Sequence, residues 1–282
     1  MLRWTCCLCT VGQVVHTLPE GEVVAGVALL ADEVYVLRDK EPRDQVEVYD
    51  AINYRLQRRL TVPNIGGFED MTSCEYYRCV YIGDGGGECI HRLDVQGAVT
   101  RWAVNDQPCG LSVNAAHNVL VTCCAVRKIK EFSSHGDLLR ELTLPDDVIN
   151  PFHAIQTRNG EFIVCHGRYV DAVNRVCKIS ADGRHVIKSH GGQPLSDIGQ
   201  YDGPVHLAVD NNEFVFVVDF NNQRVTLLSP TLEYVRQVVS PDGPKWLPML
   251  LCLDIHRRRL YAADNEYNDG KWTAGRVVVF SV

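Results

Sequence analysis

The chain has 282 residues, a net charge of −7 at pH 7 and an isoelectric point near 5.8. This length suits one large β domain with a single core, and the acidic balance disfavours a polyanionic partner. The longest apolar run, residues 23–31, is too short for a membrane-spanning helix, which needs about 20 residues. We therefore expect a monomeric cytoplasmic protein without a membrane anchor.

Residues 1–12 are expected to form a flexible leader, followed by a single domain over residues 13–282. Arg3 and a short apolar patch resemble the start of a secretory signal, which would make the protein secreted. Thr5 and Thr10 interrupt that patch, so we favour the cytoplasm. No second pair of zinc-type ligands follows Cys6, Cys7 and Cys9, and we predict no metal there.

Short apolar runs separated by turn residues follow along the whole chain. The clearest unit is residues 203–239, where four β-branched or aromatic runs are bounded by Asn, Asp, Ser or Pro, as is typical of strands joined by tight turns. The same pattern starts six times, with steps of 40 to 53 residues between starts, at Val24, Phe68, Pro108, Pro151, Pro204 and Pro248. A four-stranded repeat of this period predicts an all-β, six-bladed propeller.

The fifth repeat resembles the NHL repeat, and the sixth does so with an insertion. The matching residues are Pro204, Leu207, Val209, Asp210, Val218, Asp219, Asn221, Asn222, Arg224 and Val225, then Pro248, Leu251, Leu253, Asp254, Ala263, Asp264, Arg276 and Val277. The other four repeats match only in hydrophobic pattern. The resemblance implies a substrate-recruiting domain like the C-terminal NHL domain of tripartite-motif ubiquitin ligases. No ligase motif is present in this chain.

Residues 13–18 resemble the fourth strands of the other units, whereas the last unit ends after its third strand at residue 282. We therefore expect the N-terminal strand to complete the last blade, which removes a free sheet edge.

Two long inserts, residues 190–203 and 265–275, are expected to form loops on one face of the ring. Loops held by a rigid scaffold commonly carry function, and exposed aromatic side chains anchor partners. The aromatic candidates for partner binding on or beside these inserts are Tyr201, Trp246, Tyr267 and Trp272.

Arg127 and Lys128 are the basic candidates for partner contact on the same face. Single-stranded RNA is an alternative partner, because some NHL propellers bind it through basic loops. Acidic residues outnumber basic ones in the loops of this face, and the arginine clusters at residues 55–59 and 257–259 lie elsewhere. The charge therefore disfavours RNA.

His153 and His206 occupy equivalent positions at the start of an inner strand, and His166 ends a second strand. Three histidines near the axis are candidate ligands for a catalytic metal, as in lyases and lactonases built on related propellers. Only two of six repeats carry the inner-strand histidine, and we expect no metal and no cofactor. Asp39, Asp84, Asp219 and Asp264 end second strands, where we expect them to hold turns or pair with arginine.

Most of the 12 cysteines fall within strand runs and are expected to be reduced core thiols. Taken together, the sequence predicts a non-enzymatic scaffold that binds a protein or peptide. A metal-dependent propeller enzyme and an RNA-binding domain are the alternatives. Polar side chains converging on the axis favour an enzyme, whereas an aromatic face without them favours a scaffold.

Overall fold

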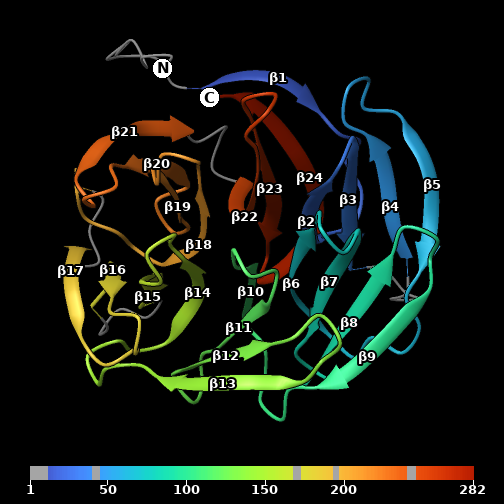
Figure 1. Ribbon diagram of the computed structural model, residues 1–282. Coiled ribbons are helices and arrows are strands. Elements are labelled where there is room, and N and C mark those ends of the chain that lie inside the picture. Colours follow the sequence, from blue (N-terminus) through green and yellow to red (C-terminus); the bar gives the residue numbers. More distant parts are fainter. Residues whose placement is uncertain (1–11, 40–44, 168–172, 193–196, 240–245) are drawn as a thin grey trace.

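In the computed structural model the chain forms six four-stranded antiparallel sheets arranged in a ring, which confirms the expected six-bladed β-propeller (Figure 1). The structure describes residues 12–39, 45–167, 173–192, 197–239 and 246–282, and only the backbone of Phe68 and Glu69. The predicted leader therefore lies outside the described residues, apart from Gly12. No helix in the described part of the chain is long and apolar enough to cross a membrane.

Each of the first five blades uses four consecutive strands. Blades one and two contain β2 (Val24–Leu30), β3 (Glu33–Arg38), β4 (Gln45–Asp50), β5 (Leu56–Thr61), β6 (Phe68–Cys74), β7 (Cys79–Asp84), β8 (Cys89–Asp94) and β9 (Val99–Ala103). Blades three and four contain β10 (Gly110–Val113), β11 (Val119–Cys123), β12 (Lys128–Phe132), β13 (Leu138–Thr143), β14 (Pro151–Gln156), β15 (Phe162–His166), β16 (Arg175–Ile179) and β17 (Val186–Gly191). Blade five contains β18 (Pro204–Val209), β19 (Val215–Asp219), β20 (Arg224–Leu228) and β21 (Tyr234–Val239).

Blade six combines the two ends of the chain. It contains β22 (Trp246–Asp254), β23 (Arg259–Asn268) and β24 (Lys271–Ser281), and its outer strand is β1 (Gln13–Thr17). Gln13 pairs with Ser281 and Thr17 pairs with Val278 in an antiparallel register. The backbone N–H of Leu18, a fully buried residue, continues the ladder by donating to the Val277 carbonyl at 2.9 Å. The closure expected from the sequence is therefore present.

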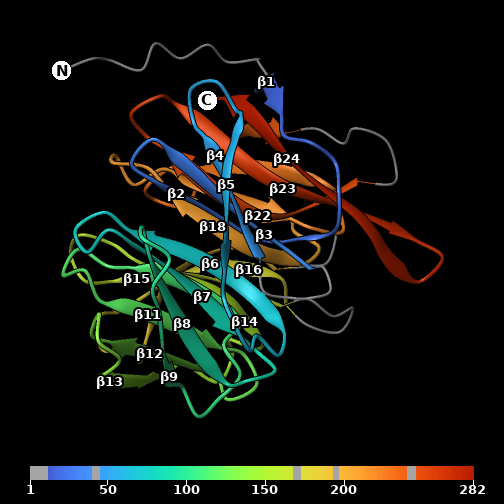
Figure 2. The same cartoon turned by 90° about the vertical axis from the view of Figure 1, so that its right-hand side faces the viewer.

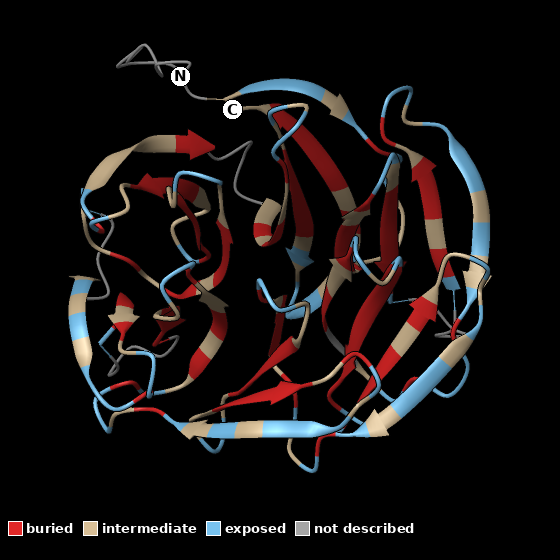
Figure 3. Cartoon of the chain, in the orientation of Figure 1, coloured by how far each residue is buried: buried red, intermediate tan, exposed pale blue. Residues whose placement is uncertain are grey.

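The hydrophobic core lies between neighbouring blades. Six clusters of buried side chains each combine residues of two adjacent sheets. One of them packs Phe216 and Val218 of blade five against Leu260 and Val278 of blade six. Figure 3 shows buried residues on the inner strands and exposed residues on the outer strands, so each sheet depends on its neighbours for stability.

The first insert, residues 190–203, lies partly outside the described residues. The second, residues 265–275, is not the expected loop, because β23 and β24 continue through it as an extended hairpin that turns at Asp269 and Gly270. Figure 2 shows this hairpin projecting from the body of the ring. Glu266 pairs with Ala274 and, after a shift in register, Tyr267 pairs with Trp272, so a cross-strand aromatic pair supports the hairpin in place of an irregular loop.

The cysteine expectation holds for most of the described thiols and is wrong for two. Cys109 and Cys124 form a disulfide between the start of blade three and its β11–β12 turn. Six of the seven other described cysteines are buried and free, including Cys89, Cys165 and Cys177. Their burial among strands fits small hydrophobic side chains.

Candidate functional site

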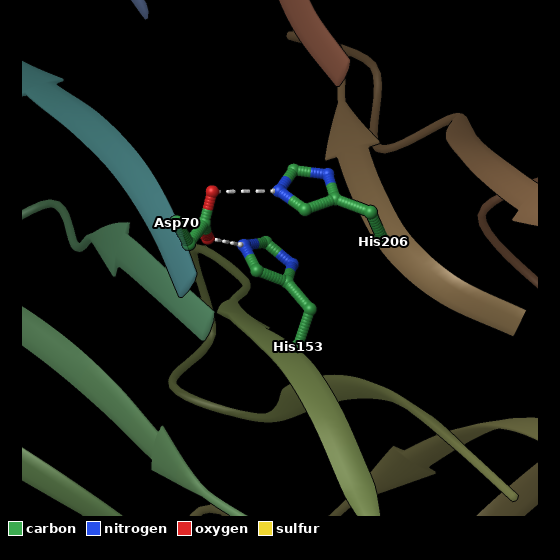
Figure 4. Close-up of side chains that lie close together, drawn as sticks. All are labelled: Asp70, His153 and His206. Atoms are coloured by element: carbon green, nitrogen blue, oxygen red, sulfur yellow. Dashed lines mark hydrogen bonds and ion pairs between the residues drawn. The ribbon is translucent and has the colours of Figure 1, made fainter. Parts of the chain in front are cut away.

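Three polar side chains meet on the propeller axis: Asp70 of β6, His153 of β14 and His206 of β18. We call them the axial cluster (Figure 4). Each follows a shift in strand register two residues after the start of an inner strand. Gly26 and Leu250 occupy the same position in blades one and six. This repeated irregularity directs one residue of each of these blades towards the axis.

Asp70 is the centre of the axial cluster and is only 1% exposed. Its carboxylate accepts hydrogen bonds from the backbone N–H groups of Met71 at 2.7 Å and Leu111 at 2.8 Å. The Nε2 atoms of His206 and His153 lie 3.3 and 3.6 Å from its two oxygens. Burial alone would raise the pKa of Asp70, but its contacts with His206, His153 and the Leu111 amide outweigh that effect and lower the pKa.

The hydrogen bonds of His206 assign its protons. The backbone N–H of Leu251 donates to Nδ1 at 3.3 Å, so Nδ1 holds a lone pair and Nε2 carries the proton that faces Asp70. His206 is therefore a neutral hydrogen-bond donor to the carboxylate. A metal at its Nε2 would require moving that proton to Nδ1, against the Leu251 N–H.

His153 stacks on His206 with ring centroids 4.0 Å apart. Its Nε2 lies 2.9 Å from the carbonyl oxygen of Leu111, a distance that requires a proton on Nε2. Burial and the neighbouring His206 lower the pKa of His153 to about 3, so the ring is neutral at pH 7. His206 thus directs an N–H group, and not a free lone pair, towards Asp70, and His153 directs its N–H to the Leu111 carbonyl. The axial cluster does not fit a metal ion bound at these Nε2 atoms.

The structure separates His166 from the two axial histidines. Its Nε2 lies 3.3 Å from the sulfur of Cys177 inside blade four, and the residue is fully buried. Burial, together with the charge of Arg175, lowers the pKa of His166 to about 4. The three histidines considered from the sequence therefore form two unrelated sites.

Asp70 was missed by sequence reasoning, although a signal for it is present. Phe68-Glu69-Asp70 aligns with Pro151-Phe152-His153 and with Pro204-Val205-His206, and the third residue of each triplet reaches the axis. The match is easily overlooked when only histidines are compared, because a carboxylate takes their place in blade two.

A group of aromatic side chains lies where blades five and six meet, and we call it the aromatic face. Trp272 lies 4.9 Å from Tyr267 and 6.1 Å from Phe220, measured between ring centroids. Trp246 covers the guanidinium of Arg276 at 4.0 Å from its ring centroid. Tyr267 is 47% exposed, whereas Trp246 and Trp272 are half-buried, so these side chains are held in place and remain accessible.

Tyr201 does not belong to the aromatic face. It is 1% exposed, packs in the core between blades four and five, and its hydroxyl lies 3.3 Å from that of Thr226. This position gives it a structural role in the free protein and removes it from the surface that the sequence indicated.

Arg127 and Lys128 each have an acidic neighbour. The guanidinium of Arg127 lies 2.9 Å from the carboxylate of Asp146, and the ammonium of Lys128 lies 2.5 Å from that of Glu141. These pairs offset the positive charge of the β11–β12 turn.

Comparisons with known proteins define the class of fold. No protein family model matches the sequence, and no curated protein matches it either. Virginiamycin B lyase from Staphylococcus aureus is 10% identical, with a TM-score of 0.62 over 94% of this chain and 98% of that one. A catalytically inactive histidine-to-alanine variant of that lyase, in a structure with quinupristin, gives 11% identity and a TM-score of 0.63.

Two further solved structures show how varied proteins of this shape are. The β-propeller domain of Cps50 (Swd1) from Myceliophteria thermophila is 12% identical, with a TM-score of 0.62 over 96% of this chain and 99% of that one. Hydrazine synthase of Kuenenia stuttgartiensis is 15% identical, with a TM-score of 0.63 over 93% and 98%. At such identities the likeness shows the fold, a β-propeller, and nothing about activity.

Proposed function

We propose that the protein is a non-enzymatic propeller that binds a segment of a partner protein on its aromatic face. The observation that carries the proposal is the projecting β23–β24 hairpin with Tyr267 and Trp272, supported from blade five by Phe220 (Figure 2). Rigid aromatic side chains that keep part of their surface exposed are the residues that anchor protein partners.

The chemistry of this surface indicates what the partner segment contains. Glu266 lies on the same hairpin and Arg276 is covered by Trp246, so aromatic rings lie beside both an acid and an arginine. We expect an extended segment with apolar side chains for the aromatic rings and a polar backbone or side chain for the hairpin. In the finer form of the proposal, suggested by the resemblance to tripartite-motif proteins, the segment belongs to a substrate of a ubiquitin ligase.

Polar side chains do converge on the axis, which is the arrangement expected of an enzyme, but the contacts within the axial cluster do not favour the metal-dependent lyase alternative. Asp70, His153 and His206 are each at most 6% exposed and direct their polar atoms to one another and to the backbone. A catalytic group needs a protonatable atom within reach of a substrate. The ion pairs of Arg127 and Lys128 likewise favour a protein partner over single-stranded RNA.

The test is a quantitative affinity capture with the full chain and with the double variant Tyr267→Ala, Trp272→Ala. Tyr76→Ala is the matched control, because Tyr76 is 67% exposed and lies on a turn between first and second strands, at the opposite face. We expect a discrete set of partners to be lost from the double variant and kept by the control.

A partner lost in this way is then reduced to its binding segment and titrated. Removing two anchoring rings should weaken its affinity by more than about 30-fold, because each anchor contributes upwards of about 1 kcal/mol. Equal capture or equal affinity with the double variant would refute the proposed surface, provided that both proteins show the same unfolding midpoint.

A further inference from the structure

The second strands of blades five and six carry the same type of ion pair, at the end of β19 and within β23. Asp219 is paired in register with Arg224, and Asp264 with Arg276. The arginine nitrogens lie 2.7 and 2.8 Å from the aspartate oxygens. Each carboxylate, 8% exposed or less, is thus neutralised by a cation on the neighbouring strand.

Blade two keeps this aspartate and replaces the arginine. Asp84 occupies the position of Asp219 and is fully buried, but its partner in register is Cys89. His91, two residues further along β8, points to the same carboxylate. Among the described residues, Asp84 forms no ion pair with a lysine or arginine.

Asp84 is nevertheless held firmly as an anion. Its oxygens accept hydrogen bonds from the backbone N–H groups of Gly66 and Gly67, both at 3.0 Å, and of Gly87 at 2.8 Å. Burial would raise the pKa of Asp84, but these amides and His91 together lower it. The carboxylate of Asp84 is therefore fixed and charged, but it lacks the arginine that pairs with the equivalent aspartate in blades five and six.

The distances among the three side chains match a tetrahedral zinc site. The Nε2 of His91 lies 3.3 Å from Oδ2 of Asp84 and 3.5 Å from the sulfur of Cys89, and that sulfur lies 3.7 Å from Oδ2. Zn²⁺ binds nitrogen and oxygen at about 2.0–2.1 Å and sulfur at about 2.3 Å, so tetrahedral angles place N and O about 3.3 Å apart and sulfur about 3.6 Å from each. The three donor atoms are therefore spaced as ligands of one tetrahedral ion would be.

We propose that Asp84, Cys89 and His91, the blade-two cluster, form a Zn²⁺ site. The ion supplies the positive charge that arginine supplies in blades five and six. On binding, the S–H bond of Cys89 breaks, a Zn–S bond forms, and the proton leaves to solvent; the proton of His91 moves to Nδ1, which frees Nε2 for the metal. A thiolate, an imidazole and a carboxylate form a donor set that suits zinc better than calcium or magnesium.

The site is buried but lies one backbone layer below the surface. The exposed residues Gly66, Gly86 and Gly87 cover it. Their packing leaves no space for side chains, since a Cβ at Gly87 would overlap Oδ2 of Asp84 and a Cβ at Gly86 would lie 2.8 Å from the Gly66 backbone. This glycine cover gives the ion a short route inward and lets the loop amides orient the carboxylate, as second-shell donors do in zinc proteins.

One feature limits the affinity that we expect. The Nδ1 atom of His91 is buried without a hydrogen-bond partner among the described residues. Zinc-bound histidines usually donate from that atom, and loss of such a contact weakens metal binding by roughly 10–100-fold. The site should therefore bind zinc more weakly than one with a complete set of outer contacts.

The chain offers a matched control in blade four. Cys177 and His166 lie as close together as Cys89 and His91, at 3.3 Å, and both are buried. No third ligand completes that pair among the described residues. Substitution of Cys177 thus removes a buried thiol beside a histidine without affecting the proposed site.

The experiment uses the full chain with Cys6, Cys7 and Cys9 replaced by serine, so that these thiols do not bind metal. After removal of metal with a chelator, we expect one Zn²⁺ per chain by calorimetric titration. Cys89→Ser and His91→Gln should weaken binding by more than about 100-fold, beyond the range of outer-contact changes. Cys177→Ser should bind as the parent does.

Two further measurements cover the case in which a variant fails to fold. Co²⁺ added to the parent should give a thiolate-to-cobalt charge-transfer band and the intense visible bands of a tetrahedral ion. Gly87→Ala should weaken zinc binding about 10–100-fold by displacing Asp84. No zinc binding by the parent, cobalt binding without a thiolate band, or equal loss in Cys177→Ser and Cys89→Ser would overturn the proposal.

Discussion

The axial cluster and the blade-two cluster each combine an aspartate with two further metal-ligand side chains, yet they differ in how their donors are used. Around Asp70, the Leu111 carbonyl accepts the proton of His153, and the Leu251 N–H keeps the proton of His206 on the nitrogen that faces the carboxylate. Around Asp84, the backbone donors bind the carboxylate, and within the described part of the chain the side chains of Cys89 and His91 have no backbone contact of that kind. Similar residue types thus form a fully hydrogen-bonded network around Asp70, whereas around Asp84 they leave side chains that a metal ion can bind.

This difference shows that proximity alone does not define a metal site. In both clusters the three ligand atoms lie within 4.8 Å of one another. What separates them is whether backbone groups hold the imidazole protons in place: the Leu251 N–H occupies Nδ1 of His206 and the Leu111 carbonyl accepts from His153, whereas no backbone group among the described residues contacts either ring nitrogen of His91.

Asp70→Ala should lower the free energy of unfolding by about 3–5 kcal/mol, because it leaves two buried backbone N–H groups and the N–H of His206 without their acceptor. Urea unfolding measures this change. Asp210→Ala is the control, since Asp210 binds two turn amides near the surface and should cost only about 1 kcal/mol. Equal costs for the two variants would mean that the axial network is not a stabilising unit.

His153 should also make the protein less stable at low pH. Its pKa is about 3 in the folded protein and near 6.5 in the unfolded chain, so between these values the unfolded chain binds a proton that the folded protein does not. Stability is therefore lost as pH decreases, by up to about 1.4 kcal/mol per pH unit, or about 2 kcal/mol from pH 7 to pH 5. Urea unfolding at both pH values should show that His153→Gln loses less by this amount, and parallel behaviour of the two proteins would contradict the assignment.

Asp84→Asn should cost about 1–2 kcal/mol in metal-free buffer, less than the loss of Asp70, because an amide still accepts part of the glycine hydrogen bonds. With zinc at 100 times its dissociation constant the parent should gain about 2.7 kcal/mol and this variant much less. Thermal unfolding with zinc and with chelator measures both effects. A variant that gains as much as the parent would show that zinc binds elsewhere.

Arg127→Gln should change the free energy of unfolding least. Its pair with Asp146 is largely exposed, and such pairs contribute about 0–1 kcal/mol. We expect a change below about 0.5 kcal/mol in urea unfolding, and no loss of the partners captured through the aromatic face. A clear loss of those partners would extend the binding surface to the β11–β12 turn.

The sequence predicted the ring, the number of blades and the closing strand because these depend on local patterns. Turn residues at regular spacing and β-branched runs mark each blade, as Asp210 and its turn do in blade five. The resemblance to NHL repeats added a functional expectation that neither the family comparison nor the fold establishes.

The polar clusters could be predicted only in part, because they depend on contacts between distant strands. His206 meets Asp70 across 136 positions, and only the alignment of all six inner strands would have revealed their common place. The blade-two cluster becomes visible only when Cys89 is compared with Arg224 and Arg276, which occupy the same position in blades five and six. The positions of the aromatic residues in the two inserts could not be predicted for a different reason. Such a residue can be buried, as Tyr201 is, or paired across strands, as Tyr267 and Trp272 are, and the local sequence is the same kind in both cases.

The most direct test of the contrast between the two clusters is an anomalous difference map of the zinc-soaked protein, recorded on both sides of the zinc absorption edge. The account predicts one peak between Oδ2 of Asp84, the sulfur of Cys89 and Nε2 of His91, and none beside Asp70, His153 and His206. A peak on the axis with blade two empty would contradict it.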